Sequence, residues 1–83
     1  MNIYVGNLSH DVSGENLRHA FEGFGQVSSA KIVKDKYTGQ SRGFGFVQMP
    51  DRAEGQAAVK NLNGKQLLGR RMNVNEAGLR PIR

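Results

Sequence analysis

RGFGFV, residues 42–47, places one arginine, two glycines and two phenylalanines within six residues near the middle of an 83-residue chain. In a β-strand, residues two apart point to the same face, so Phe44 and Phe46 share one face of any strand formed here. If that face lies in the core, the two rings are ordinary packing. If it faces solvent, two large aromatic side chains lie in water beside Arg42, and their exposure needs a functional reason.

Length, composition and charge limit the class of protein. A chain of this size forms one small domain, and the absence of cysteine excludes disulfide scaffolds and thiolate metal sites. No apolar run approaches the roughly 20 residues that span a bilayer, and MNIYVGNLS (residues 1–9) lacks the features of a signal peptide. We therefore expect a soluble, cytoplasmic protein, with a nuclear or organellar location left open. The net charge of +5 favours anionic partners.

Hydrophobic periodicity predicts six main elements in the order strand, helix, strand, strand, helix, strand. The predicted strands cover residues 2–6, 27–34, 42–49 and 71–77, and the predicted helices cover residues 13–24 and 51–62. A short extended or hairpin piece is expected at 65–70. We assign 1–77 to one domain and 78–83 to a short, flexible, basic tail. This order predicts an α+β, ferredoxin-like βαββαβ fold, in which two helices cover one face of a four-stranded antiparallel sheet.

The first, second and fourth strands indicate which side chains face away from the helices. With helices on one face only, each strand is expected to turn its apolar side chains toward them and its other side chains toward water. The first strand then gives Ile3 and Val5 to the core and turns Tyr4 outward. The same alternation turns Lys31 outward from the second strand and Asn75 outward from the fourth.

The third strand fits two registers. In one, Phe44 and Phe46 point into the core. In the other, Val47 points into the core, and the two rings face solvent together with Arg42 and Gln48. The second register is favoured because it leaves the charged and the amide side chains in water. A slip or bulge of one residue would reverse it.

IYVGNL (residues 3–8) and RGFGFVQM (residues 42–49) together resemble the RNA recognition motif family. The longer element matches seven of the eight positions in the pattern K/R-G-F/Y-G/A-F-V-x-F/Y. The shorter element is similar to the partner pattern, aliphatic-aromatic-aliphatic-x-Asn-Leu. The resemblance spans residues 2–77, and the layout is similar to small, single-motif bacterial members. Met49 departs from the pattern where the family usually has an aromatic residue.

The resemblance implies single-stranded RNA as the partner, because its bases can splay out and stack on aromatic side chains. Tyr4 and Phe44 would then stack under two successive bases, Phe46 would lie between them against sugar rings, and Arg42 would pair with a phosphate. The other residues expected to contact RNA are Lys31, Gln48, Arg71, Asn75, Glu76 and Arg80.

The charges are distributed as this partner requires. The two predicted helices hold three basic and four acidic residues, whereas the rest of the chain holds nine basic and three acidic residues. The positive excess therefore lies entirely on the strands, the loops and the tail. A surface of this kind neutralises phosphates, and its binding weakens as salt rises.

Two other functions stay open at this point. Exposed aromatic patches also mark protein interfaces, so a protein-interaction module with this fold is one alternative. Single-stranded DNA is the other, because stacking and phosphate contacts tolerate both sugars. No catalytic constellation is visible in the sequence. We therefore expect a monomeric binding protein without enzymatic activity, cofactor, metal, small-molecule substrate or membrane partner.

Overall fold

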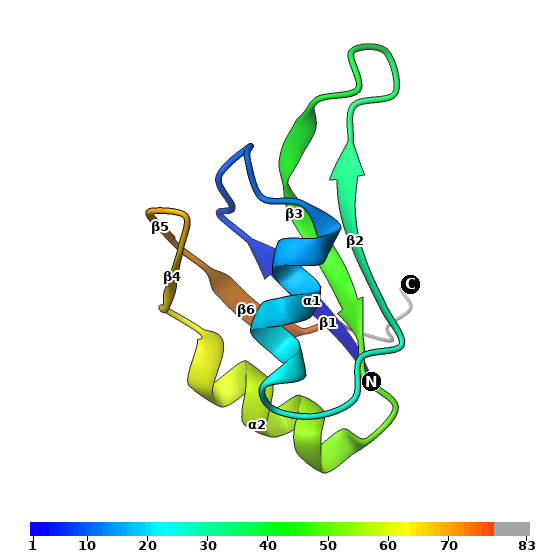
Figure 1. Cartoon of the computed structure of the whole chain (residues 1–83), viewed down its shortest axis with the longest axis vertical. Helices are drawn as coiled ribbons and strands as arrows, with labels where there is room; N and C mark the ends of the chain where they lie inside the picture. Colours follow the sequence, from blue (N-terminus) through cyan, green and yellow to red (C-terminus); the bar gives the residue numbers. More distant parts are fainter. Residues whose placement is uncertain (78–83) are drawn as a thin grey trace.

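A four-stranded antiparallel sheet forms the centre of the computed structural model, which describes residues 1–77 (Figure 1). Its strands are β1 (Asn2–Gly6), β2 (Ser29–Lys34), β3 (Ser41–Gln48) and β6 (Asn73–Glu76). The spatial order is β2-β3-β1-β6, so the two strands that carry the sequence motifs lie next to each other at the centre. The predicted tail, 78–83, and with it Arg80, lies outside the described residues.

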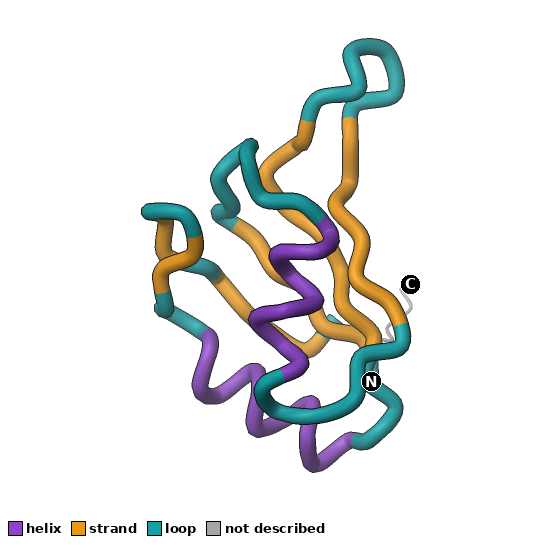
Figure 2. The backbone as a smooth tube through the Cα atoms, in the orientation of Figure 1, coloured by secondary structure: helices purple, strands orange, loops and turns teal. Residues whose placement is uncertain are grey.

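Two helices cover one face of this sheet (Figure 2). They are α1 (Gly14–Glu22) and α2 (Arg52–Leu62), and a small separate hairpin of β4 (Gln66–Leu67) and β5 (Arg70–Arg71) lies beside the sheet. The predicted ferredoxin-like arrangement is confirmed. Neither helix of the described chain has the length and apolar character needed to cross a membrane.

Side-chain caps fix where the helices begin. The Ser13 hydroxyl accepts a hydrogen bond from the backbone N–H of Asn16, whose side chain accepts one from the Ser13 N–H, so the two residues form a capping box. The Asp51 carboxylate accepts a hydrogen bond of 3.0 Å from the backbone N–H of Glu54 at the start of α2. From these starting points each helix turns its apolar side chains, including Leu17 of α1, into the core.

The third strand adopts the register that turns its aromatic rings away from the helices. Val47 and Met49 are 1% and 0% exposed and belong to the core, whereas Phe46 is 42% exposed. Met49, the departure from the family pattern, therefore fills the interior and leaves the open face unchanged.

Gly43 produces an irregularity in β3 that the sequence alone does not explain. Ile32 pairs with Gly45 and Lys34 pairs with Ser41, so β3 takes four residue steps where β2 takes two. Gly43 has a φ of +83°, a left-handed conformation that glycine adopts without steric penalty. Its carbonyl accepts a hydrogen bond of 2.8 Å from the backbone N–H of Leu8. This bond joins the two motif segments above the end of β1.

The predicted strand 71–77 is divided in the structure. The N–H of Met72 donates to the carbonyl of Lys65, and the carbonyl of Met72 accepts from the N–H of Gly64, each at 2.8 Å. Met72 is therefore bonded to the chain before the hairpin and not to β1. Pairing with the main sheet begins only at Asn73, which lies opposite Gly6.

The turn of the small hairpin contains a strained leucine. Leu67 pairs with Arg70, so the turn consists of Leu68 and Gly69, with φ values of +51° and +89°. A two-residue turn with two positive φ values favours Asn-Gly, because the first position suits asparagine far better than a branched apolar residue. Left-handed backbone destabilises an ordinary residue by about 1–2 kcal/mol.

We expect Leu68→Asn to raise the free energy of unfolding by about 1 kcal/mol, because asparagine tolerates the left-handed conformation. Urea denaturation of the purified domain measures the change. Leu67→Asn is the matched control: Leu67 packs against the core, so the same chemical change one residue earlier should lower stability. A Leu68→Asn variant that is no more stable than the original chain would contradict strain at this turn.

Candidate nucleic-acid interface

Three aromatic rings gather on the face of the sheet that the helices leave open. We call Tyr4, Phe44 and Phe46 the aromatic platform. The ring centroids are 5.9 Å apart for Tyr4–Phe44, 5.9 Å for Tyr4–Phe46 and 6.2 Å for Phe44–Phe46. The interplanar angles of 35°, 65° and 87° are tilted or edge-on arrangements, which aromatic pairs prefer over direct face-to-face stacking.

Strand register and one small residue bring these rings together. Tyr4 lies directly opposite Phe46 in the pairing of β1 with β3. Gly6 follows two residues after Tyr4 on the same face, and the Tyr4 ring lies over it. A Cβ atom at Gly6 would come within 2.7 Å of Cζ and 2.8 Å of Cε2 of that ring, closer than real Cβ contacts allow. The glycine of IYVGNL is therefore what permits the ring to lie flat along the strand, a role that sequence reasoning missed.

A row of side chains crosses the sheet through the platform. The register places Lys31, Phe46, Tyr4 and Asn75 opposite one another on four adjacent strands. Three strand spacings of about 4.8 Å make this row about 14 Å wide. The predicted contacts Lys31 and Asn75 thus flank the platform on the same face. Gln48 shares this face because it lies two residues beyond Phe46.

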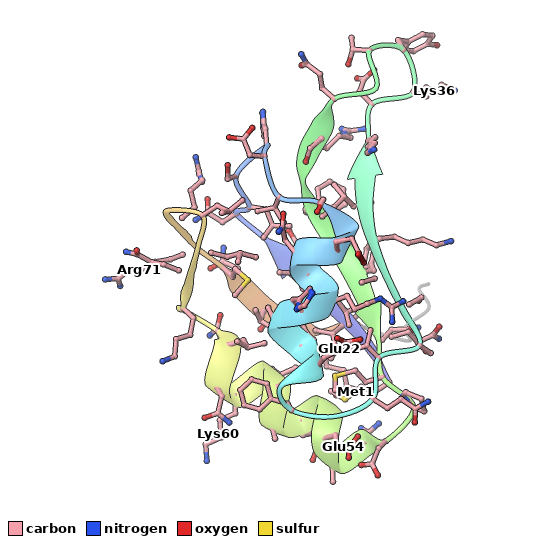
Figure 3. The ribbon with its side chains drawn as sticks, viewed as in Figure 1. Met1, Glu22, Lys36, Glu54, Lys60 and Arg71 are labelled. Atoms are coloured by element: carbon pink, nitrogen blue, oxygen red, sulfur yellow. The ribbon has the colours of Figure 1, made fainter. Side chains whose placement is uncertain are left out.

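Glu76 and Arg71 lie away from the platform. Glu76 is opposite the buried Ile3 and follows the alternation of the core residue Val74, so it turns toward the helix side. There its carboxylate forms an ion pair of 3.3 Å with Arg52 of α2. Arg71 belongs to the small hairpin and points outward from it, away from the body of the domain (Figure 3).

Asn7 holds that hairpin against the end of β1. Its φ of +57° is left-handed, a conformation that asparagine adopts more readily than most residues. Its Nδ2 donates a hydrogen bond of 2.7 Å to the carbonyl of Arg71, and its Oδ1 accepts one of 2.6 Å from the Arg70 guanidinium. The asparagine of the IYVGNL motif therefore orients a basic hairpin beside the platform, which the sequence pattern alone did not reveal.

Comparison with known proteins agrees with this geometry. The family model for the RNA recognition motif matches residues 3–73. The chain belongs to the RNA recognition motif family. The match includes Tyr4, Phe44 and Phe46, and therefore all three rings of the platform.

Individual relatives of this RNA recognition motif protein cover most of its length. Glycine-rich RNA-binding protein 1 of Mycosarcoma maydis is 48% identical over 79 residues, which are 95% of the chain but only 45% of that protein. RbpB of the cyanobacterium Nostoc sp., which is named for RNA binding, is 47% identical over 93% of the chain and 75% of its own length. The crystal structure of an RNA-binding protein called PG1 has a TM-score of 0.92 and 44% identity, with 99% of both chains covered.

The loop between β2 and β3 places further basic residues beside the open face of the sheet. Lys34 ends β2, Lys36 lies in the loop, and the exposed Arg42 lies at the start of β3. Figure 3 shows Lys36 projecting sideways from the loop, whereas the labelled Glu22 and Glu54 lie beside the helices. Together with the hairpin arginines, these residues put positive charge at two ends of the open face.

Asp35 organises this loop. Its Oδ1 accepts hydrogen bonds of 3.0 Å from the backbone N–H of Thr38 and 2.8 Å from that of Tyr37. These bonds, in that order of importance, hold the pKa of the Asp35 carboxyl below its usual value of 3.8, and the positive charge of Arg42 lowers it further. The charged form is therefore the one that the folded loop stabilises.

The loop order that depends on Asp35 should be present above pH 3.8 and should be lost as the pH falls through the lower pKa of the folded protein. We expect the amide resonances of Tyr37 and Thr38 to titrate with a midpoint below 3.8 in an NMR pH series. Asp35→Asn is the control, because it should remove this transition. A midpoint at or above 3.8 would contradict the hydrogen-bonded carboxylate.

Proposed function

We propose that this domain binds single-stranded RNA by stacking bases on the aromatic platform and neutralising phosphates with the surrounding lysines and arginines. The observation that carries the proposal is the gathering of three rings on the one face of the sheet that no helix covers. Every base presents a flat π-face, and each stacked base contributes about 1–3 kcal/mol by truncation. A small domain that leaves such rings uncovered has a surface suited to bases.

The roles we propose follow the position of each residue. Tyr4 and Phe44 stack with successive bases, and Phe46 contacts the sugars between them. Arg42 contacts a phosphate, and Lys31, Gln48 and Asn75 on the platform face supply contacts to base edges or backbone. Arg71, on the hairpin and away from the rings, contacts the backbone of a strand that extends beyond the platform. Glu76, at the end of the sheet, and Arg80, beyond the described residues, stay predictions.

We also propose that residues 1–77 act as one binding domain without enzymatic activity, followed by a basic tail. The proposed working form is a monomer with no small-molecule substrate. Its proposed location is the cytoplasm, although similar proteins include a mitochondrial one from Arabidopsis thaliana and a chloroplastic one from Nicotiana sylvestris. The chain spans 45% of the length of the fungal relative and 75% of that of the cyanobacterial one. These proposals therefore concern this domain and not the further segments of such longer proteins.

The combined substitution of Phe44→Ala and Phe46→Ala should weaken binding of a labelled, random-sequence 12-nucleotide RNA by about tenfold or more, because it removes two of the three rings. Fluorescence anisotropy gives the dissociation constant, and circular dichroism checks that the fold is intact. Phe24→Ala is the matched control, because it truncates a ring that packs against the core and not on the platform.

If the folded variant with both Phe44→Ala and Phe46→Ala bound the RNA as tightly as the original chain, RNA binding at the platform would be disproved. In that case a protein partner would become the better explanation of the exposed rings. A DNA oligonucleotide of the same length is titrated in parallel. Equal affinity for the two would extend the proposal to single-stranded DNA, and weaker DNA binding would indicate contacts with the 2′-hydroxyl.

A further inference from the structure

The loop between β2 and β3 carries an aromatic ring that the platform does not use. The Tyr37 side chain is 87% exposed, about twice the exposed fraction of Phe46. A ring this exposed gains almost nothing from packing within its own domain, since hydrophobic stabilisation scales with the apolar area removed from water. Its position therefore calls for a partner that covers it.

The loop holds this ring on an ordered base. The backbone N–H of Asp35 donates to the carbonyl of Gln40 at 2.8 Å, and the N–H of Gly39 donates to the carbonyl of Asp35 at 2.7 Å. The Asp35 carboxylate also binds the N–H groups of Tyr37 and Thr38. Asp35 is thus hydrogen-bonded to all four residues of the segment 37–40. A ring presented by such a turn loses little conformational freedom when it binds a ligand.

The charge around Tyr37 indicates an anionic partner. Lys36 Nζ lies 5.6 Å from the centre of the Tyr37 ring, in a cation–π arrangement. Within residues 34–42 the basic side chains number three and the acidic ones number one, and the single carboxylate, that of Asp35, is engaged by backbone N–H groups. A flat aromatic face on a basic loop suits a nucleobase with its phosphates, because the ring can stack with the base while the cations neutralise the backbone.

Basic residues of β2 connect the platform with this loop. Lys31 and Lys34 both lie on β2, and the loop follows directly after Lys34. Lys31 is also the edge of the platform row, directly opposite Phe46. Figure 1 shows the loop extending beyond the ends of the other strands, in line with β2 and β3. An RNA strand that leaves the platform past Lys31 therefore meets positive charge as it approaches the loop.

We propose that Tyr37 is a second base-binding position, which stacks with a base of the same RNA strand that occupies the platform. The inference rests on the proposed function, because it requires RNA on the platform. It adds that RNA long enough to reach the loop binds more tightly than RNA that covers the platform alone. Lys36 lies over one face of the ring, and the base stacks on the opposite face.

Two lengths of RNA separate this inference from the proposed function. A random-sequence 4-nucleotide RNA covers the platform, whereas 12 nucleotides, at about 3.4 Å each even when stacked, extend about 40 Å. That length exceeds the longest dimension of the domain, 36 Å. Tyr37→Ala should leave binding of the short RNA unchanged and weaken binding of the long RNA about fivefold or more. Amide-shift titration measures the short RNA, and anisotropy measures the long one.

Two further variants test the chemistry of the contact. Tyr37→Phe keeps the ring and should bind the long RNA within about twofold of the original chain, whereas Tyr37→Leu keeps apolar bulk without a π-face and should behave like Tyr37→Ala. The amide resonances of Thr38 and Gly39 in the free variants verify that the loop keeps its order.

Each result bears on one claim. The role of Tyr37 would be overturned if Tyr37→Ala bound the long RNA with the affinity of the original chain, or if Tyr37→Leu did so. It would also be overturned if Tyr37→Ala lost the same affinity for the short RNA as for the long one. If both Tyr37→Ala and Tyr37→Phe weakened binding of the long RNA, stacking of a base on the ring would be overturned. If Phe44→Ala with Phe46→Ala leaves binding of the short RNA unchanged, the platform itself fails, and that outcome is distinct from all of those above.

Discussion

The alternation of side chains along β3 is the constraint on which the rest of this structure depends. Val47 and Met49 are completely enclosed, and in a sheet covered on one face a strand that buries one set of alternate residues exposes the other. Because the helices cover one face only, exposure of that other set places Phe44 and Phe46 on an open surface. The same residues that stabilise the core thus determine the position of the rings, and moving the strand by one residue would remove both core and platform together.

Backbone features at the ends of the central strands then shape the site around that constraint. The positive φ of Gly43 allows β3 to bulge and to bond Leu8, while Gly6 leaves space for the ring of Tyr4. Asn7 connects β1 to the basic hairpin. The short motif therefore supplies one ring to the platform and two supports for it. These supports position rings that bases can cover without a large rearrangement of the protein.

Much of this arrangement could be predicted from the sequence, because it depends on local patterns. Alternation and helical periodicity predict the element order, and the polarity of Arg42 and Gln48 favours the outward register of β3. The positions that were not foreseen depend on long-range contacts. Glu76, whose contact with RNA stays a prediction, lies opposite Ile3 and pairs with Arg52, and the fourth strand is divided because Met72 bonds to a segment before the hairpin. Neither pairing leaves a periodic signal in the sequence.

An amide-shift titration of the isotopically labelled domain with random-sequence RNA tests the central claim most directly, because it reports which face meets the ligand. RNA stacked on the open face should shift the amides of Tyr4, Phe44 and Phe46 in β1 and β3 while leaving those of α1 and α2 nearly unchanged. Shifts confined to the two helices, with silent sheet residues, would contradict the account, because the uncovered rings would then have no part in binding.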